Sequence, residues 1–496
     1  MTSNKEIRVR FAPSPTGGLH PGNARVAIFN YLFVQHEKAI GNNVKYVLRM
    51  EDTDEERSTL DYEASIIDDL KWLGINWDEG PFRQSDRTSR YSELAQQLLE
   101  KGFLYKCYCS EEELEQERSV QVKSGKPPRY KGKCKNLTAE EKAEKEKKTK
   151  TCTLRFDVDK FINELNNSTD LLTYHDLIKN KEARSVMSNP LHVIGDFVVM
   201  KQSGTPTYNF AVVVDDIDMK ITHVFRGEDH VSNTFRQIMI FRALGVKQED
   251  LPQYGHLPML LAPDKTKLSK RSGGIPIHEY KKMGFLAEAM FNHLAFLGGG
   301  IKILDETDEK NLIAESFEYE HTASSACVYD VEKLRHINAK FINKIDASEA
   351  LKLLTRDMAL NDDWKKSYDE KDFIGIVALA KDGARTLLEV ISNIELFMPY
   401  TVSEEEFLDT NSERDQIINI LYDHGVSSGS LISGADWKNI KDKIVSSSTL
   451  SGGKLFKTLR VILTGKKDGP PLDAIMTKIN NDIIVERIKK AKALVG

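Results

Sequence analysis

Two short segments of the chain carry residue types suited to phosphate chemistry. Residues 13–23 (PSPTGGLHPGN) contain three glycines, which let a backbone approach phosphate closely, and a single histidine, His20. Residues 267–271 (KLSKR) contain two lysines three positions apart, and such cations can neutralise charge on a leaving pyrophosphate. Alone, the first segment could be an ordinary turn and the second a basic surface loop. The two segments in one chain are a far more specific signal of phosphate chemistry than either segment alone.

The sequence around the first segment predicts a β-α-β-α unit. Residues 7–11 are expected to form a buried strand, residues 23–37 a helix, residues 44–50 a second strand and residues 61–73 a second helix. This order favours a parallel sheet. The loop after the first strand would then direct its amides and the positive helix end toward a bound anion. That loop matches neither the GxGxxG dinucleotide pattern nor the Walker pattern.

Further along the chain, the pattern changes twice. Residues 110–150 favour helix and are rich in Lys and Glu, which is typical of an insertion. A helix is expected near residues 232–244, and nearly all of the chain from about residue 330 onward favours helix. The strands expected between these parts are 193–201, 208–214 and 222–225.

Composition excludes several classes of protein. The chain has 496 residues, of which 40% are hydrophobic and 29% charged, as in ordinary multidomain soluble proteins. No apolar run approaches the ~18 residues of a membrane span, and the start lacks the apolar core of a secretory signal. The five cysteines make no disulfide framework, which predicts a reduced, cytosolic protein.

Two segments are basic although the net charge is -5. Residues 121–150 carry eleven basic and four acidic groups, and residues 454–492 carry ten basic and four acidic groups. These segments are either solvated faces or contacts for a polyanion at two places.

The two chemical segments also carry a family resemblance. They resemble the HIGH and KMSKS pair of class I aminoacyl-tRNA synthetases. With their flanks (RFAPSPTGGLHPGNAR, RMEDTD, YNFAVVVDD, FRGEDH and KLSKR, in this order) they resemble the glutamyl-tRNA synthetases of the bacterial type. The resemblance is dense over residues 8–271 and continues weakly at residues 459–472 (LRVILTGKKDGPPL).

The resemblance implies an α/β multidomain fold. A class I Rossmann-like catalytic domain (residues 1–100 and 205–245) would be interrupted by an acceptor-binding insert (residues 101–204). A stem-contact region with the KLSKR loop (residues 246–330) and an all-α anticodon-binding half (residues 331–496) would follow.

The implied activity is ATP-dependent ligation of L-glutamate to tRNA(Glu) through a glutamyl-adenylate, with release of pyrophosphate and AMP. ATP would come with Mg2+, and the protein is expected to be a cytoplasmic monomer without membrane contact. A non-discriminating form that also charges tRNA(Gln) stays open. Three rival readings are a small-molecule adenylyltransferase, a shortened tRNA-modifying paralogue and a non-catalytic tRNA-binding module. The long helical half opposes the first two, and the intact phosphate-binding set opposes the third.

Glutamate brings two carboxylates and one ammonium to its site. By resemblance, Arg10 and Tyr208 hold the side-chain carboxylate, Arg226 holds the α-carboxylate, and Glu51 and Ser14 hold the α-ammonium. Arginine suits a carboxylate because its planar fork binds two oxygens at once. All five residues are expected at the ends of strands.

The resemblance also implies residues for ATP and tRNA. The implied catalytic residues are His20, Lys267, Ser269 and Lys270. The implied ATP-binding residues are Gly17, Gly18, His20, Gly22, Asn23 and Lys270. Lys270 would be the main cation for pyrophosphate, and Arg460 and Lys466 would contact tRNA.

The cysteines raise a separate question. Cys107, Cys109 and Cys134 have a spacing at which thiolates can bind zinc. Some family members hold zinc here with a fourth ligand, often a histidine two residues after the last cysteine, where this chain has Asn136. Tyr130 is the alternative fourth ligand, as in a shorter relative. The alternative interpretation is that these cysteines are reduced thiols that only pack in the core and bind no metal.

Overall fold

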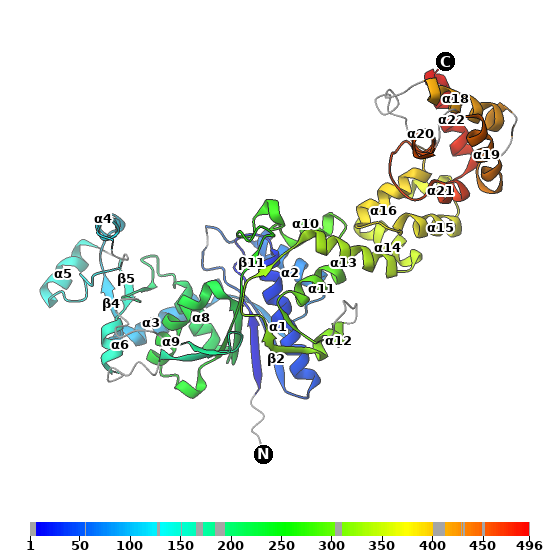
Figure 1. Ribbon diagram of the computed structural model, residues 1–496. Helices are drawn as coiled ribbons and strands as arrows, with labels where there is room; N and C mark the ends of the chain where they lie inside the picture. The colour runs from blue at the N-terminus through cyan, green and yellow to red at the C-terminus, as the bar shows by residue number, and fades with distance from the viewer. Residues whose placement is uncertain are drawn as a thin grey trace. The chain divides into compact units, whose positions relative to one another are not determined.

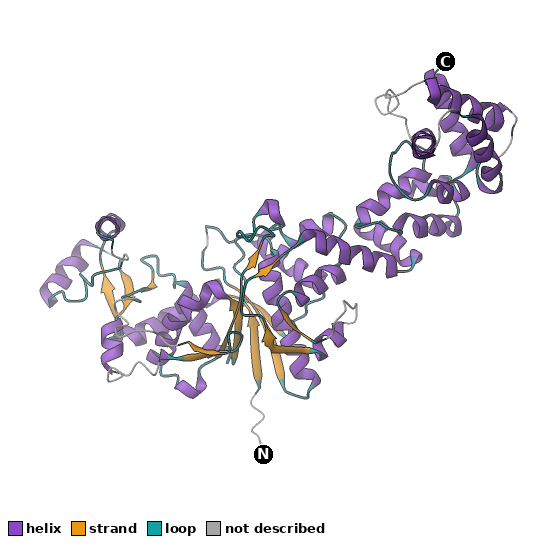
Figure 2. Cartoon of the chain, in the orientation of Figure 1, coloured by secondary structure: helices purple, strands orange, loops and turns teal. Residues whose placement is uncertain are grey.

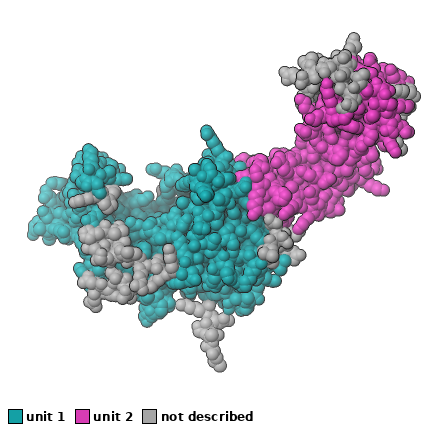
Figure 3. Space-filling model, in the orientation of Figure 1, with its two compact units in different colours: residues 1–278, 291–330 teal, residues 279–290, 331–496 magenta. Residues whose placement is uncertain are grey.

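The computed structural model describes eleven stretches of the chain in two compact units. The described residues are 6–54, 56–125, 129–149, 151–164, 172–183, 194–302, 310–399, 412–427, 429, 432–448 and 452–495. Unit 1 comprises residues 1–278 and 291–330, and unit 2 comprises residues 279–290 and 331–496 (Figure 3). Unit 1 mixes strands and helices, whereas the described part of unit 2 is helical (Figure 2). No helix among these residues is both long and apolar enough to cross a membrane.

A seven-stranded sheet forms the centre of unit 1 (Figure 1). In spatial order its strands are β3 (Glu79–Arg83), β2 (Val44–Met50), β1 (Ile7–Phe11), β9 (His223–Gly227), β10 (Gln253–Leu257), β6 (Tyr174–Asp176) and β7 (Lys181–Ala183). All neighbours pair in parallel except β6 and β7, which are antiparallel. The parallel sheet expected from the start of the chain is therefore confirmed. Its strands bring their carboxyl ends to one edge, where ligands bind in such sheets.

Helices α1 (Pro21–Ala39) and α2 (Leu60–Trp72) follow the first two strands and confirm the predicted β-α-β-α unit. Helix α1 buries Ala24, Ala27 and Ile28, at the three- and four-residue spacing of one helix face. Helix α2 begins at Thr59, whose side chain accepts a hydrogen bond from the backbone of Tyr62 and so satisfies a free amide of the first turn. The sheet edge is thus flanked by two helix N-termini.

The prediction of a strand over residues 208–214 is wrong. This segment is the start of helix α8 (Tyr208–Asp218), in which every residue from Phe210 to Asp216 is buried. A helix buried on all sides has a continuous apolar sequence, and such a run cannot be told from a buried strand by periodicity. The other two predicted strands exist in altered form, as β8 (Val198–Met200) and β9, while residue 193 lies outside the described residues. The helix expected near residues 232–244 is α9 (Val231–Ala243).

Residues 101–164 and 194–204 form a smaller antiparallel sheet with helices. Its strands are β4 (Leu104–Cys107), β5 (Thr153–Phe156) and β8, and its helices are α4 (Glu111–Lys123), α5 (Ala139–Lys148) and α6 (Val158–Glu164). The helices expected within residues 110–150 are confirmed; residues 126–128 and 150 lie outside the described part. Strands β6 and β10 of the large sheet come from the segments expected to form the insert and the stem-contact region. The four domain boundaries therefore stay a prediction.

Several shorter elements complete unit 1. They are α3 (Thr88–Glu100), β11 (Leu260–Leu261), β12 (Gly299–Ile301), α12 (Lys310–Glu315), β13 (Phe317–Thr322) and β14 (Cys327–Val328). The division between the units falls within α10 (Ile277–Lys282) and α11 (Ala287–Phe296).

Unit 2 confirms the helical half expected from about residue 330. Its helices are α13 (Val331–Lys344), α14 (Ala347–Asp357), α15 (Glu370–Lys381), α16 (Leu387–Ile394), α18 (Ser412–Leu421), α19 (Trp437–Ser447), α20 (Gly452–Thr464), α21 (Leu472–Lys478) and α22 (Asn481–Val495). They share one apolar core, in which the rings of Trp364 and Phe373 stack with centroids 4.1 Å apart. Each fully buried large side chain in such a core contributes roughly 1.5–3 kcal/mol.

Candidate functional site: a charged cavity at the carboxyl edge of the sheet

A cavity of about 610 Å³ lies beside the carboxyl ends of β1, β2, β9 and β10. Its size is in the usual range for small-molecule sites. The lining includes all five residues that were predicted to bind glutamate, namely Arg10, Ser14, Glu51, Tyr208 and Arg226. Four separate segments of the chain supply these residues, so the fold assembles the predicted set.

Two buried guanidinium groups give the cavity its positive charge. Arg226 is 5% exposed, and its Nη2 donates to Thr234 Oγ1 at 2.7 Å. The Nη1 of Arg226 is buried and has no hydrogen-bond partner among the described residues. Arg10 is 4% exposed, and its Nε donates to Asp216 at 3.4 Å. An unpaired buried cationic donor is costly, so this wall of the cavity is built for an anion.

Glu51 supplies the opposite charge. It follows β2 directly, is buried, and accepts a hydrogen bond from Arg49 Nη2 at 3.3 Å. Burial raises the pKa of Glu51 to about 6, although the charges of Arg49 and Arg10 act to lower it. At neutral pH the side chain is therefore an anion within reach of a bound ammonium.

Tyr208 lies in the first turn of α8, and its predicted position at the end of a strand is wrong. Its hydroxyl lies 3.0 Å from His230 Nδ1, and both residues line the cavity. Burial raises the pKa of Tyr208 to about 12, so the phenol stays neutral and can donate a hydrogen bond to a carboxylate. Burial lowers the pKa of His230 to about 4, so this ring is neutral at pH 7.

A buried ion network behind the cavity was not anticipated from the sequence. Arg49 is fully buried, and its Nη1 donates to Asp216 at 2.8 Å while its Nε lies 3.6 Å from Asp215. Asp215 also accepts from Arg87 Nε at 2.7 Å and from the hydroxyl of Tyr91 at 3.0 Å. These contacts tie α8 to β2 and α3. The signal in the sequence was the Asp-Asp pair after an apolar run, since buried carboxylates require cationic partners.

The loop between β1 and α1 brings His20 to the cavity. His20 is the residue immediately before helix α1, where backbone amides are unpaired by the helix. Burial lowers the pKa of its imidazole, and the charge of Lys267 lowers it further. Gly22 and Asn23 also line the cavity.

Gly17 and Gly18 line an adjoining hollow of about 210 Å³, together with Ser14 and His20. A Cβ on Gly18 would lie 2.9 Å from the Cβ of Pro276, so this position requires glycine. The predicted ATP-binding loop is thus contiguous with the cavity, and tight packing rather than a left-handed backbone accounts for Gly18.

The KLSKR segment contributes two residues to the cavity, of which one is a cation. Lys267 lines it, together with Leu268. Ser269 precedes a short 3-10 turn (Lys270–Ser272), and both Ser269 and Lys270 are exposed and lie outside the residues that line the cavity. Lys267 thus lies at the cavity. The role of Lys270 as the main cation for pyrophosphate stays a prediction.

Comparison with known families agrees with this geometry. A family model described as "tRNA synthetases class I (E and Q), catalytic domain" matches residues 6–336, which is more than half of the chain. The chain belongs to this synthetase family. A second model, described as an anticodon binding domain, matches residues 331–492, which make up most of unit 2 of this synthetase.

Relatives of the synthetase match it over nearly its full length. The glutamate–tRNA ligase of Sulfurihydrogenibium sp. is 40% identical, with 97% of each chain covered. The glutamate–tRNA ligase of Bacillus licheniformis is 38% identical, with 97% of this chain and 98% of that protein covered. A crystal structure of a glutamate tRNA ligase from Elizabethkingia meningosepticum, in complex with its amino acid, has a TM-score of 0.74 at 25% identity and covers 99% of this chain and 100% of that one.

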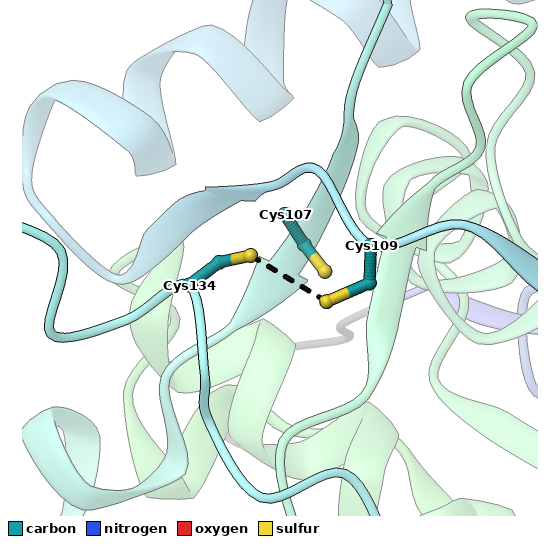
Figure 4. Close-up of side chains that lie close together, drawn as sticks. All are labelled: Cys107, Cys109 and Cys134. Atoms are coloured by element: carbon teal, nitrogen blue, oxygen red, sulfur yellow. Dashed lines mark hydrogen bonds between the residues drawn. The ribbon is translucent and has the colours of Figure 1, made fainter. Parts of the chain in front are cut away.

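The synthetase also carries a compact group of thiols. Cys107, Cys109 and Cys134 are buried, their Sγ atoms lie within 4.8 Å of one another, and Figure 4 shows the side chains converging. The hydroxyl of Tyr130 lies 3.5 Å from Cys107 Sγ and 3.5 Å from Cys109 Sγ. The guanidinium of Arg155 lies 4.1 Å from the centroid of the Tyr130 ring. The three thiols are thus close enough to share one ion, and thiolates suit zinc, while the phenol of Tyr130 is the nearest further oxygen donor.

The two predicted tRNA contacts of unit 2 differ in their surroundings. Arg460 lines a hollow of about 270 Å³ with Phe456 and Lys457, and its Nη1 has no hydrogen-bond partner among the described residues. Phe456 is 43% exposed. Lys466 instead donates from Nζ to Glu395 at 2.9 Å and to Ser392 Oγ at 2.8 Å. Arg460 therefore lines a hollow with one buried donor unpaired among the described residues, whereas Lys466 is paired within the fold.

Proposed function

We propose that this chain is a glutamate–tRNA ligase that joins L-glutamate to tRNA(Glu) with ATP. The observation that carries the proposal is one cavity with two buried guanidinium groups, Arg10 and Arg226, and one buried carboxylate, Glu51. Two cations and one anion complement the two carboxylates and the ammonium of glutamate. The full-length similarity to proteins named glutamate–tRNA ligase supports the same substrate.

The reaction runs in two displacements. An oxygen of the α-carboxylate attacks the α-phosphorus of ATP, the bond to the β-phosphate oxygen breaks, and pyrophosphate leaves. A ribose hydroxyl of the terminal adenosine of tRNA then attacks the carbonyl carbon of the glutamyl-adenylate. AMP leaves with the electron pair of the broken bond, and the hydroxyl proton is lost. Neither step needs a covalent bond to the protein, so catalysis rests on positioning and charge stabilisation.

Each wall of the cavity has a role in this scheme. Arg226 holds the α-carboxylate in line with the α-phosphorus, and Arg10 with Tyr208 holds the side-chain carboxylate. Glu51, with Ser14, accepts the α-ammonium. Charge supports this scheme, because it sets both carboxylates against arginines and the ammonium against Glu51. The choice of Arg226 for the α-carboxylate and of Arg10 for the side-chain carboxylate rests on the family resemblance.

The nucleotide lies on the other side of the cavity in this proposal. The amides of the Gly17-Gly18 loop and of the α1 N-terminus hold the phosphates with His20. Lys267, and Lys270 after movement of its turn, neutralise charge on the departing pyrophosphate. Mg2+ bound with ATP supplies further neutralisation of the phosphates.

Glutamate-dependent exchange of labelled pyrophosphate into ATP, measured with and without tRNA, tests the activity. Glutamine and aspartate serve as control amino acids, since the first lacks one carboxylate charge and the second is one methylene shorter. Charging assays with purified tRNA(Glu) and tRNA(Gln) then measure discrimination, and we expect tRNA(Glu) to be charged. Exchange that is equal for glutamine and glutamate would contradict the assignment of Arg10.

A zinc ion held by Cys107, Cys109, Cys134 and Tyr130 is part of the proposal. The support is the convergence of three buried thiols, which are ligands that structural zinc sites use, with the phenol of Tyr130 as the nearest further oxygen, 3.5 Å from two of them. Metal analysis of the purified chain tests it. We expect stoichiometric zinc, its loss in Cys134→Ser, and its retention in the matched control Cys327→Ser, which alters a buried cysteine elsewhere. Equal zinc in the two variants would exclude this site.

We further propose that the protein acts in the cytoplasm as a monomer and binds tRNA at two places. The support is the pair of basic segments, residues 121–150 and 454–492, and the absence of disulfides among the described cysteines. Sedimentation of the chain with and without tRNA tests the monomer. A dimer at working concentration would overturn that part of the proposal.

A further inference from the structure

A chain of buried polar groups is attached to Arg226. Asp176 on β6, His256 on β10 and Thr234 on α9 are exposed by 1%, 0% and 0%. None of the three is among the residues that line the cavity, whereas Arg226 is. Because these groups do not line the cavity, their polar atoms act on a ligand through residues that do: Arg226, and for Thr234 also His230, whose backbone oxygen accepts from its hydroxyl.

The hydrogen bond between Asp176 and His256 determines the tautomer of the histidine. His256 Nδ1 lies 2.7 Å from Asp176 Oδ2. Burial would raise the pKa of Asp176, but the hydrogen bond from His256 and the backbone amide of Lys179 hold this pKa below its usual value. An ionised carboxylate only accepts hydrogen bonds, so Nδ1 of His256 must carry a hydrogen. Burial lowers the pKa of His256, so the ring is neutral and its Nε2 is an acceptor that faces Arg226 and, at 3.1 Å, the hydroxyl of Thr234.

Hydrogen bonds to His256 and Thr234 hold the guanidinium group of Arg226 in place. Arg226 Nε donates to His256 Nε2 at 3.3 Å, and Arg226 Nη2 donates to Thr234 Oγ1 at 2.7 Å. Two edges of the planar group are thereby occupied. The remaining Nη1 is buried without a partner among the described residues, and Arg226 faces the cavity. The planar fork is therefore held in one orientation before a ligand arrives, which reduces the entropy lost on binding.

We propose that Asp176 and His256 are positioning residues of the glutamate site: Asp176 holds His256 as its Nδ1–H tautomer, and His256 Nε2 holds Arg226 with Nη1 aimed at the α-carboxylate. This inference rests on the proposed function. It assigns a role to β6, which the sequence places far from the other residues of the site. Without Asp176, Nε2 could carry the hydrogen, and it would then oppose the Nε–H of Arg226.

A purely structural role for these residues is the alternative. The contact between Asp176 and His256 also joins β6 to β10, so its loss could weaken the sheet and every ligand site alike. A positioning role instead predicts a selective loss. Ligands with an α-carboxylate should bind more weakly, and ligands without one should be unaffected.

Two substitutions of His256 separate its contact with Asp176 from its contact with Arg226. His256→Asn keeps a donor near the Nδ1 position, facing Asp176, and removes the acceptor for Arg226. His256→Gln can place an amide oxygen near the Nε2 position and so restore the acceptor. We expect the KM for glutamate in tRNA-supplemented pyrophosphate exchange to rise roughly ten- to a hundred-fold in His256→Asn, as for loss of a hydrogen bond to a charged group, and less in His256→Gln.

The selective readout uses 4-amino-5-hydroxypentanoate, which is glutamate with its α-carboxylate reduced to an alcohol. Its inhibition constant should be the same in the wild type and in His256→Asn. His223→Asn is the matched control, because His223 is a largely buried histidine of β9 without a hydrogen bond to Arg226 among those described. It should leave both constants unchanged.

The outcomes are distinct. A wild-type chain without glutamate-dependent exchange would overturn the proposed function itself. An active wild type with a glutamate KM and an inhibitor constant that rise together in His256→Asn, or do not rise at all, would overturn the positioning role alone. If His256→Asn does not fold, Thr234→Val gives a second test, because it removes the hydroxyl that accepts from Arg226 Nη2 at 2.7 Å. The same hydroxyl lies 3.1 Å from His256 Nε2 and donates to the backbone oxygen of His230, so this variant loosens the same group of contacts around Arg226. We expect the same selective loss, and equal effects on both ligands would overturn the role.

Discussion

Glutamate affinity should fall as the pH drops through 6, because the carboxylate that meets the ammonium loses its charge there. Burial raises the pKa of Glu51 to about 6, and Arg49 and Arg10 offset part of this effect. Only the ionised form pairs with an ammonium. With this pKa, roughly 90% of the side chain is ionised at pH 7 and roughly 10% at pH 5, so affinity should fall about ten-fold across that range.

Calorimetric titration of L-glutamate between pH 5 and 7.5 measures this effect. Glu51→Gln should bind weakly, with little pH dependence in that window. Glu63→Gln is the matched control, because Glu63 is also buried but pairs with Arg83 at 2.9 Å and does not line the cavity. It should follow the wild-type profile. His230 should not interfere, since burial lowers its pKa to about 4.

The same pKa has a consequence for stability. A carboxyl with a folded pKa of about 6 and an unfolded value of 4.5 binds its proton more readily when folded. Ionised Glu51 therefore costs about 2 kcal/mol above pH 6, and this cost disappears as the pH falls to 4.5. Glu51→Gln should accordingly raise the free energy of unfolding at pH 7.5 and leave it nearly unchanged at pH 4.5. The binding experiment decides the argument. If the glutamate affinity of the wild type does not change between pH 5 and 7.5, or changes with the same slope as that of Glu51→Gln, the assignment of Glu51 to the ammonium is refuted.

Three further outcomes are expected. Arg10→Ala should weaken glutamate binding by about 2–5 kcal/mol, because a buried carboxylate loses its partner, and Michaelis constants should show ATP unaffected. Lys267→Ala and Lys270→Ala should each slow single-turnover adenylation on the order of 10²–10³, with little change in glutamate affinity; near-normal rates would remove the residue from that role. Neutralising Lys457 and Arg460 together should flatten the salt dependence of tRNA affinity and alter discrimination between tRNAs, since the bases of a single-stranded anticodon can be read by side chains. Unchanged slopes would identify this segment as a solvated face.

The start of the fold was predictable because local signals and tertiary structure agree there. Strand β1 (IRVRF) alternates apolar residues with arginine and β2 (VKYVLRM) is mostly apolar, while α1 and α2 have helical spacing with Pro21 and Thr59 at their N-termini. Buried parallel strands and the helices that cover them carry such patterns independently of distant contacts. The helical character of unit 2 was predictable for the same reason.

The placement of Tyr208 failed because its segment is buried on every side. An apolar run of this kind is compatible with a strand or with a helix, and the choice depends on the neighbours. The pair Asp215-Asp216, near the end of the segment, indicates a helix rather than a strand once its partners are known. On a helix, consecutive carboxylates point in different directions, and here Asp216 meets Arg49 at 2.8 Å while Asp215 meets Arg87 at 2.7 Å. Partners so far apart in sequence cannot be assigned before the fold is known.

The residues that touch the substrate and those that hold them differ in how they can be found. Arg10, Glu51 and Arg226 lie in dense motifs, whose family resemblance implies the groups that they bind, and their charges agree with that prediction. Asp176 and His256 carry no such signal: an aspartate in a short strand and a histidine before a leucine are ordinary in sequence. Their role follows from the sheet. Strand β6 pairs in parallel with β10, which sets Asp176 opposite Tyr254 and leaves its carboxylate 2.7 Å from His256 Nδ1, and β10 pairs with β9, which sets His256 opposite Arg226. In this proposal the sheet register, rather than any motif, determines how rigidly the α-carboxylate is held. A search for motifs alone would find Arg226 and would miss Asp176 and His256, the residues that orient it.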